Sequence, residues 1–331
     1  MNRRADIDRA KGLAIALVVF GHIVARQDPA HVYWYPALRR AVYGFHMPFF
    51  FYLSGLVTWL SGHARTPPAA WPRLLRARAR RLLIPFAVMA FTITAGKLAA
   101  ARFIHVDNPP PGLLGGLADT IWHPLASPAY SLWYLAVLFL LSVATPLLIA
   151  ACRGRLWPVI CIFAAFQFIP LPWHLYLAET ARYALFFGAG LAAGALGNHW
   201  TVWIDRWRWP LIAAFVTGFA FVALDGRMLP FNLRLVILGL AAMPALHALV
   251  RFPCLSSART LATLGRYSLM IYLFNTIFIG LAKGLLLLAT GWNGTHFLPF
   301  AAVLLSAGLL GPVLLKRTVL RAVPVLDRMT E

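Results

Sequence analysis

Long apolar runs recur along the whole chain, separated by short polar, proline-rich or arginine-rich segments. A helix needs about 20 mostly apolar residues to cross the hydrocarbon core of a bilayer. The runs predict about ten transmembrane helices, near residues 10–27, 41–62, 81–101, 130–150, 156–172, 181–198, 209–225, 233–250, 266–289 and 296–316. The pattern therefore predicts an all-α polytopic integral membrane protein, with residues 1–331 forming a single membrane-embedded domain.

The composition supports this fold class. Hydrophobic residues make up 61% of the 331 positions and charged residues 12%, which leaves too little polar surface to cover a soluble globule of this size. The basic N-terminus followed by an apolar run is not read as a secretory signal, because the run contains His22, ends at Arg26 and Gln27, and lacks a small-x-small cleavage site. The three widely spaced cysteines predict neither a disulfide framework nor a metal knuckle.

The net charge of +20 would suggest a nucleic-acid partner in a soluble protein. Here most of the 30 Lys and Arg residues fall in alternate loops, which is the distribution of cytoplasmic loops in membrane proteins. It predicts that both termini are cytoplasmic and that membrane lipid, not nucleic acid, is the partner of these side chains. On the other side, the longest connection is 102–129, rich in proline and glycine, which we interpret as a covering loop or a lid.

Ionisable side chains inside predicted spans are costly in lipid and are therefore candidates for function. His22 lies about a dozen residues into the first span, near the bilayer midplane or just beyond it. His46, early in the second span, is expected on the same outer half, and Arg26 follows His22 by one helical turn. A neutral histidine bonded to a neighbouring helix is the alternative, and a metal is not expected because no third ligand is nearby.

A second cluster surrounds the start of the third span, where arginines crowd residues 71–85. At α-helical spacing, Arg73, Arg76 and Arg80 share one face, while Arg78 and Arg81 share another. An anchor on lipid headgroups is one interpretation. Two basic faces are more than an anchor requires, and arginine binds phosphate bidentately. The second interpretation is therefore a binding site for a cytoplasmic phosphorylated ligand such as acyl-coenzyme A.

The few acidic residues do not complete a hydrolase. Asp8 precedes His22 by fourteen residues, too far along a helix to orient its imidazole, and it is expected to form a structural ion pair with a cytoplasmic arginine, Arg4 or Arg81. Ser54 is interpreted as a small residue at a helix contact. The chain contains no phosphate loop, dinucleotide fingerprint or zinc motif.

Three segments in order resemble the signature motifs of the acyltransferase-3 family of membrane proteins. They are RADIDRAKGLAIALVVFGH at residues 4–22, FHMPFFFYLSG at 45–55 and RARRLLIP at 78–85, with weaker echoes in SLWYL at 131–135, YALFFGAG at 183–190 and GRYSLMIY at 265–272. The short chain is most similar to the fucose 4-O-acetylase-like branch. One position departs from the pattern: many members end the last motif with histidine, whereas this chain has Asn275.

The resemblance implies a ten-helix core that transfers acetyl from cytoplasmic acetyl-CoA to a hydroxyl of a sugar, a glycan or a lipid-linked saccharide, in the bacterial inner membrane. It implies that His22 matches the essential histidine of the first helix and that Arg78 and Arg81 match donor-binding arginines.

Combining the residues with the resemblance gives a mechanistic hypothesis. His22 removes the proton of the acceptor hydroxyl as it attacks the thioester, without a metal, and an acetyl-histidine intermediate remains open. The other expected roles are acceptor or thioester binding by His46, donor binding by Arg76, Arg78, Arg80 and Arg81, and acceptor binding by Trp133, Tyr134 and Arg26. The rival hypotheses are a transporter or flippase that relays protons through its histidines, which inverted repeats would favour, and a non-catalytic scaffold.

Overall fold

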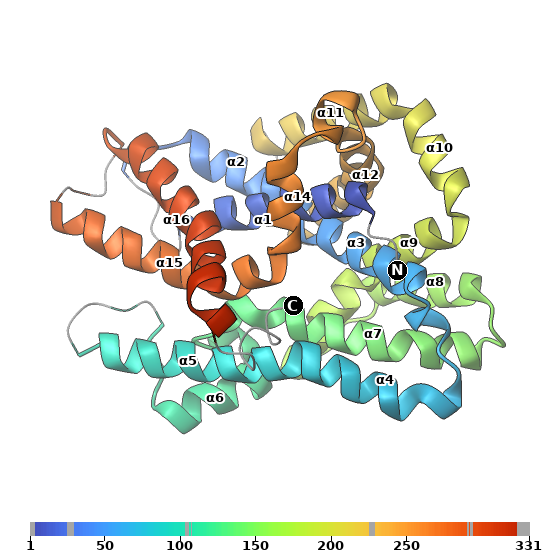
Figure 1. Cartoon of the computed structure of the whole chain (residues 1–331), viewed down its shortest axis with the longest axis horizontal. Coiled ribbons are helices and arrows are strands. Elements are labelled where there is room, and N and C mark those ends of the chain that lie inside the picture. Colours follow the sequence, from blue (N-terminus) through green and yellow to red (C-terminus); the bar gives the residue numbers. More distant parts are fainter. Residues whose placement is uncertain are drawn as a thin grey trace. The chain divides into compact units, whose positions relative to one another are not determined.

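A computed structural model describes residues 4–24, 30–102, 106, 108–224, 229–289, 291 and 294–322 (Figure 1). Within these ranges the regular structure is helical and includes no β-strand, which confirms the all-α prediction. Each of the ten predicted apolar ranges overlaps a helix. The main helices are α1 (Ala5–His22), α2 (Trp34–Tyr43), α3 (His46–Leu60), α4 (Trp71–Arg78), α5 (Ile84–Ala100), α6 (Leu113–Trp122), α7 (Trp133–Ala151), α8 (Leu156–Ala165), α9 (Leu177–Leu196), α10 (Asn198–Arg206), α11 (Arg208–Leu224), α12 (Phe231–Leu249), α13 (Pro253–Ser256), α14 (Arg259–Arg266), α15 (Ser268–Ala289) and α16 (Phe297–Thr318).

Several of these helices are long and apolar enough to cross a membrane. By length and composition, five segments of the described chain qualify: Pro68–Ala100, Tyr130–Ala151, Phe231–Leu249, Ser268–Ala289 and Phe297–Ala322. The pair α10 and α11, bent by 72°, makes a sixth if it counts as one broken span. These segments identify a membrane protein, while the number of ten spans and the cytoplasmic termini stay predictions.

The structure differs from the predicted pattern in the segment between α5 and α7. The range 102–129 was expected to be a loop, yet Leu113–Trp122 forms α6. The cluster of prolines ends at Pro111, and the ten residues that follow Gly112 contain none, so nothing interrupts backbone hydrogen bonding there. Apolar side chains at helical spacing then favour a helix over a loop.

The described chain divides into two compact units. The first unit comprises Met1–Leu53 and Leu196–Glu331, and the second comprises Ser54–Ala195, so the boundary falls within α3. The single domain expected for residues 1–331 stays a prediction.

Small residues allow close helix packing in the first unit. A β-carbon added to Gly265 of α14 would overlap the carbonyl oxygen of Asp8 in α1, and one added to Gly12 would overlap the carbonyl oxygen of Leu261. Glycine at both positions lets the two backbones approach without intervening side chains, as is common where helices associate in membranes. This contact fixes the start of α1, the helix that ends at His22.

The second unit is built on aromatic and aliphatic packing around α7 and α9. Phe186 and Phe187 of α9 and Phe163 of α8 are completely buried, as are Leu135 and Val137 of α7. Burial of a large apolar side chain contributes about 1.5–3 kcal/mol. This core holds the start of α7, where the predicted aromatic site lies.

Candidate active site

His22 is the last residue of α1, and its imidazole is partly buried. Its Nδ1 lies 2.7 Å from Oδ1 of Asn275 on α15. Asn275 is completely buried, and its side-chain Nδ2 donates to the carbonyl oxygens of Ile271 (2.9 Å) and Tyr272 (2.8 Å). No hydrogen bond to Nε2 of His22 exists among the described residues. One ring nitrogen is therefore held by Asn275, and the other has no hydrogen-bond partner in the described part of the chain.

His46 is the first residue of α3 and is buried. Its Nδ1 donates to the carbonyl oxygen of Val42 at 2.8 Å, which leaves Nε2 as the unprotonated nitrogen of the neutral ring. The ring of Tyr43 packs edge-on against this imidazole at 4.9 Å, while the Tyr43 hydroxyl donates to the carbonyl oxygen of Gly21, next to His22. Tyr43 thus connects the surroundings of the two histidines. Arg26, the third residue predicted here, lies outside the described residues.

The predicted arginine cluster spans an irregularity in the helix. Between α4 and α5, residues Ala79–Leu83 form a π-helical turn, labelled η3. Hydrogen bonding from i to i+5 changes the angular spacing of side chains within this turn. The division of the arginines into two faces, expected from α-helical spacing, stays a prediction. Turns of this kind often occur at functional sites.

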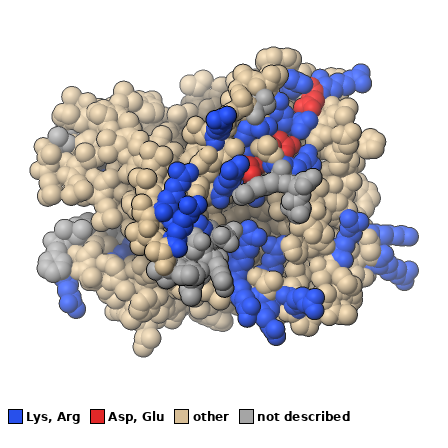
Figure 2. All heavy atoms as spheres, in the orientation of Figure 1, with Lys and Arg blue, Asp and Glu red and all other residues tan. Residues whose placement is uncertain are grey.

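The side chains of this cluster differ in exposure. Arg76, Arg80 and Arg81 are exposed, and Figure 2 shows basic side chains gathered over the α4 segment. Arg78 is partly buried, and its Nε is a buried donor without a hydrogen-bond partner in the described part of the chain. Partial burial, and then the positive charges of Arg78 and Arg81, lower the pKa of His63 below its ordinary value. These three basic groups form an electropositive site in the second unit that can bind an anion.

The predicted aromatic pair lies at the start of α7. Trp133 is partly buried and contacts the Tyr183 ring, with centroids 4.8 Å apart. Tyr134 is buried, and its hydroxyl lies 2.8 Å from Oγ of Ser54. Ser54 therefore makes a helix contact, as sequence reasoning proposes. The partial exposure of Trp133 leaves part of its side chain available to a ligand.

Glu179, near the start of α9, is a buried carboxyl that sequence reasoning missed. Its side chain is 1% exposed, its Oε1 accepts a hydrogen bond from the Tyr130 hydroxyl at 3.2 Å, and its Oε2 has no partner within the described ranges. Burial raises the pKa of Glu179 above its ordinary value. The signal in the sequence was a lone acid just before an apolar run.

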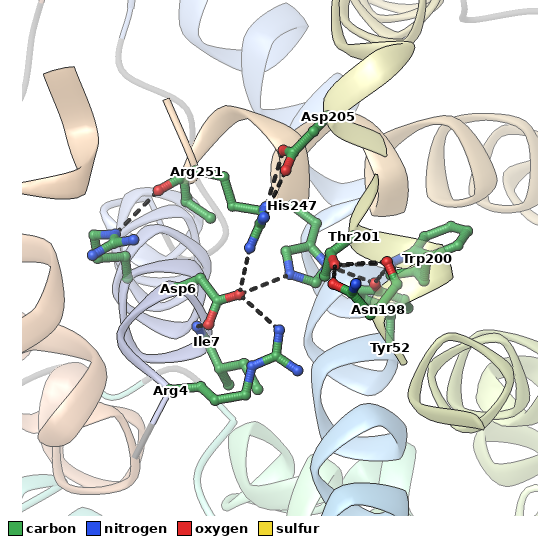
Figure 3. A network of polar contacts seen from close by, with 12 residues as sticks. Arg4, Asp6, Ile7, Tyr52, Asn198, Trp200, Thr201, Asp205, His247 and Arg251 are labelled. Atoms are coloured by element: carbon green, nitrogen blue, oxygen red, sulfur yellow. Dashed lines mark hydrogen bonds and ion pairs between the residues drawn. The ribbon is translucent and has the colours of Figure 1, made fainter. Parts of the chain in front are cut away.

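A larger polar network at the start of α1 also escaped prediction (Figure 3). Asp6 is buried, and its Oδ2 lies 3.1 Å from Nη1 of Arg251, 3.2 Å from Nη2 of Arg4 and 3.7 Å from Nε2 of His247. Its Oδ1 accepts the backbone N–H of Ile7 at 2.9 Å. Burial alone would raise the pKa of Asp6, but the interaction with His247 and the charge of Arg4 outweigh it and lower that pKa.

His247 extends this network to two further helices. Trp200 of α10 donates its indole N–H to the Tyr52 hydroxyl at 2.8 Å, and that hydroxyl lies 2.7 Å from Nδ1 of His247. Because the Tyr52 oxygen accepts from Trp200, its own proton is directed to His247, whose Nε2 then faces Asp6. Arg251 pairs bidentately with Asp205 at 2.6 and 3.0 Å. The network joins α1, α3, α10 and α12 in the first unit.

The structure shows an ion pair of Arg4 that was not predicted. Nη2 of Arg4 lies 3.2 Å from Oδ2 of Asp6, which also faces the basic groups that follow α12. The ion pair of Arg4 with Asp8, expected from the sequence, stays a prediction.

Among the described residues, no group of three or more His, Cys, Asp or Glu side chains is arranged to hold a metal ion.

Comparison with known proteins adds independent information. The model of a family described as an acyltransferase domain matches residues 4–317. Nodulation protein NolL of Sinorhizobium fredii is 34% identical over 144 residues, which cover 43% of this chain and 36% of that protein. Nodulation protein NolL of Mesorhizobium japonicum is 23% identical over 326 residues, covering 92% of this chain and 83% of that protein. No solved structure matches.

Proposed function

The chain belongs to this acyltransferase family, and from that premise we propose that it transfers an acetyl group from cytoplasmic acetyl-CoA to a hydroxyl of a sugar or glycan. The observation that carries the proposal is that Nε2 of His22 has no hydrogen-bond partner among the described residues, while the other ring nitrogen is held by Asn275. A neutral imidazole in this state is a proton acceptor at the end of an apolar helix.

The proposed reaction uses His22 as general base. Its Nε2 accepts the proton of the acceptor hydroxyl while the oxygen attacks the carbonyl carbon of the thioester. The tetrahedral intermediate then collapses, the carbon–sulfur bond breaks, and the coenzyme A sulfur receives the proton from the imidazolium. His46, with its own Nε2 unprotonated, accepts a hydrogen bond from another hydroxyl of the acceptor.

We assign the donor site to the electropositive group of Arg78, Arg81 and His63, with Arg76 and Arg80 exposed on the same segment. A buried donor without a partner costs about 1–3 kcal/mol, and a phosphate oxygen bound at Nε of Arg78 would remove that cost. Arginine suits this role because its planar fork binds phosphate bidentately.

We assign the acceptor site to Trp133, with Tyr134 as a further proposed contact, while the acceptor-binding role expected for Arg26 stays a prediction from the sequence. Support comes from the partly exposed indole of Trp133, since aromatic rings pack well against the apolar faces of sugars. The bacterial inner membrane is the proposed location, because coenzyme A thioesters are supplied from the cytoplasm.

The test is transfer of labelled acetyl from acetyl-CoA to a panel of saccharides by the purified protein in lipid nanodiscs. His22→Ala should lower kcat by about 10²–10⁴-fold, the range for loss of a general base. The matched control is His199→Ala, which removes an exposed histidine of α10 and should leave transfer unchanged. Full activity of a folded His22→Ala protein would remove His22 from the reaction.

The donor site is tested separately. Arg78→Lys keeps the charge but loses the guanidinium fork, so KM for acetyl-CoA should rise about tenfold with little change in kcat, equivalent to one charged hydrogen bond. Arg73→Lys on the same helix changes an exposed side chain outside the proposed site and should have no effect. An unchanged KM in Arg78→Lys would show that only the charge of the segment matters, and an equal rise in both variants would show that the effect is not specific to Arg78.

A further inference from the structure

We infer that Asn275 is a positioning residue that fixes the tautomer of His22, so that the proton stays on Nδ1 and the lone pair stays on Nε2. This inference rests on the proposed function of His22. It concerns the position at which this chain departs from the motif that it otherwise resembles.

The orientation of the Asn275 amide is determined by its own helix. Its Nδ2 donates two hydrogen bonds, to the carbonyl oxygens of Ile271 and Tyr272, one turn earlier in α15. A flipped amide would place Oδ1 against these two carbonyl oxygens and lose both bonds. The oxygen of the amide, and not its nitrogen, is therefore the atom that faces His22.

This orientation decides which nitrogen of His22 carries the proton. The 2.7 Å contact joins Nδ1 to an oxygen that can only accept, so Nδ1 must donate. In the neutral ring, Nε2 then has the lone pair, which is required both for removing a hydroxyl proton and for forming an acetyl-histidine. The other tautomer would place two acceptors in contact.

The same bond favours proton uptake during the reaction. When Nε2 accepts a proton, Nδ1 continues to donate to Oδ1, and the amide dipole stabilises the imidazolium. The Cys-His-Asn sites of papain-like proteases use asparagine in this way. Asn275 is completely buried, so its oxygen is shielded from solvent in the wild type.

The experiment compares Asn275→Leu, Asn275→Asp and the wild type in the acetyl-transfer assay over a range of pH. Leucine should lower kcat about 100-fold or more, since loss of the orienting residue of a triad costs up to about 10⁴, and KM for acetyl-CoA should not change. Aspartate should retain more activity than leucine and shift the basic group in the pH profile of kcat upward, because a carboxylate stabilises the imidazolium. Leu281→Ala, which changes an exposed residue of α15, should match the wild type.

Two further measurements separate positioning from folding. In ¹⁵N-histidine spectra, assigned with His22→Gln, the wild-type Nδ1 should give the signal of a protonated ring nitrogen and Nε2 that of an unprotonated one. In a His22→Ala background, Asn275→Leu should cause no additional loss of kcat, because both residues act through one group.

The outcomes distinguish the two proposals. If His22→Ala retains full activity, the proposed function of His22 fails whatever Asn275 does. If His22→Ala is inactive while Asn275→Leu keeps the wild-type kcat and pH profile, only the positioning inference is overturned. A spectrum with the proton on Nε2 overturns it as well, even if the leucine variant does not fold.

Discussion

Replacing Asp6 by asparagine removes one negative charge from the network at the start of α1 and keeps the size of the side chain. In the wild type, Asp6 accepts from Arg251 and Arg4, faces Nε2 of His247, and caps the N–H of Ile7. The amide oxygen of asparagine can keep one of these contacts. It cannot balance the charge of the two guanidinium groups.

The expected cost follows from how well these partners are solvated. Removing one member of a fully buried ion pair costs about 3–5 kcal/mol. Here the side chains of Arg251 and Arg4 are 26% and 37% exposed, and Arg251 keeps its bidentate bond to Asp205. Water therefore compensates part of the loss. We expect a loss of about 2 kcal/mol of stability for Asp6→Asn.

The assay is thermal unfolding of the purified protein in detergent. At roughly 2 °C per kcal/mol for a chain of this length, the variant should unfold about 4 °C below the wild type. Asp205→Asn is the matched control: this carboxylate shares Arg251 but is 30% exposed, so its removal should cost about 1 kcal/mol or less.

The pH dependence provides an independent check. Because the folded protein lowers the pKa of Asp6, its ionised form stabilises the fold at any pH above the ordinary pKa of about 4. The contribution is lost as the pH falls below that value. The difference between wild type and Asp6→Asn should therefore be constant near neutrality and shrink below about pH 4. Equal losses for Asp6→Asn and Asp205→Asn, or a gap that grows in acid, would refute this reasoning.

Two other predictions concern packing and burial. Gly265→Ala should destabilise the protein by about 3 kcal/mol or more, because the added β-carbon would overlap the Asp8 carbonyl. The control Gly280→Ala, where an added β-carbon has no atom within 4 Å, should be neutral, and equal unfolding temperatures for the two variants would contradict the close approach of α1 and α14. Glu179→Gln should become more stable relative to the wild type as the pH rises above about 4.5, because the raised pKa of Glu179 makes its ionisation costly in the folded state. A difference in unfolding temperature between the two proteins that does not change with pH would count against this.

The fold class and the first-helix histidine were predictable because each depends on local sequence. Apolar length alone indicates helices in lipid, and every predicted apolar range overlaps one. His22 was identifiable because an imidazole in an apolar run needs a partner. The identity of that partner was not, since Asn275 lies 253 residues away and the sequence gives no sign of the contact.

The features that were not predicted depend on tertiary packing or on irregular backbone. Nothing in the sequence marks Asp6 as the centre of a polar network, because Arg251 and His247 come close to it only after folding. The π-helical turn at Ala79–Leu83 has no proline or glycine to announce it. Glu179 appears as an ordinary start of a helix until its burial is known.

An amide suits the partner of His22 better than a carboxylate would, for a reason that follows from the membrane. An aspartate buried at position 275 would carry a charge into an apolar helix bundle, at a cost of several kcal/mol. It would recover that cost by holding His22 as the imidazolium. A histidine that is protonated before the acceptor arrives cannot remove a proton. Asparagine orients the ring through the same oxygen position, adds no charge, and leaves the resting imidazole neutral, so the charged pair forms only while the proton is in transit.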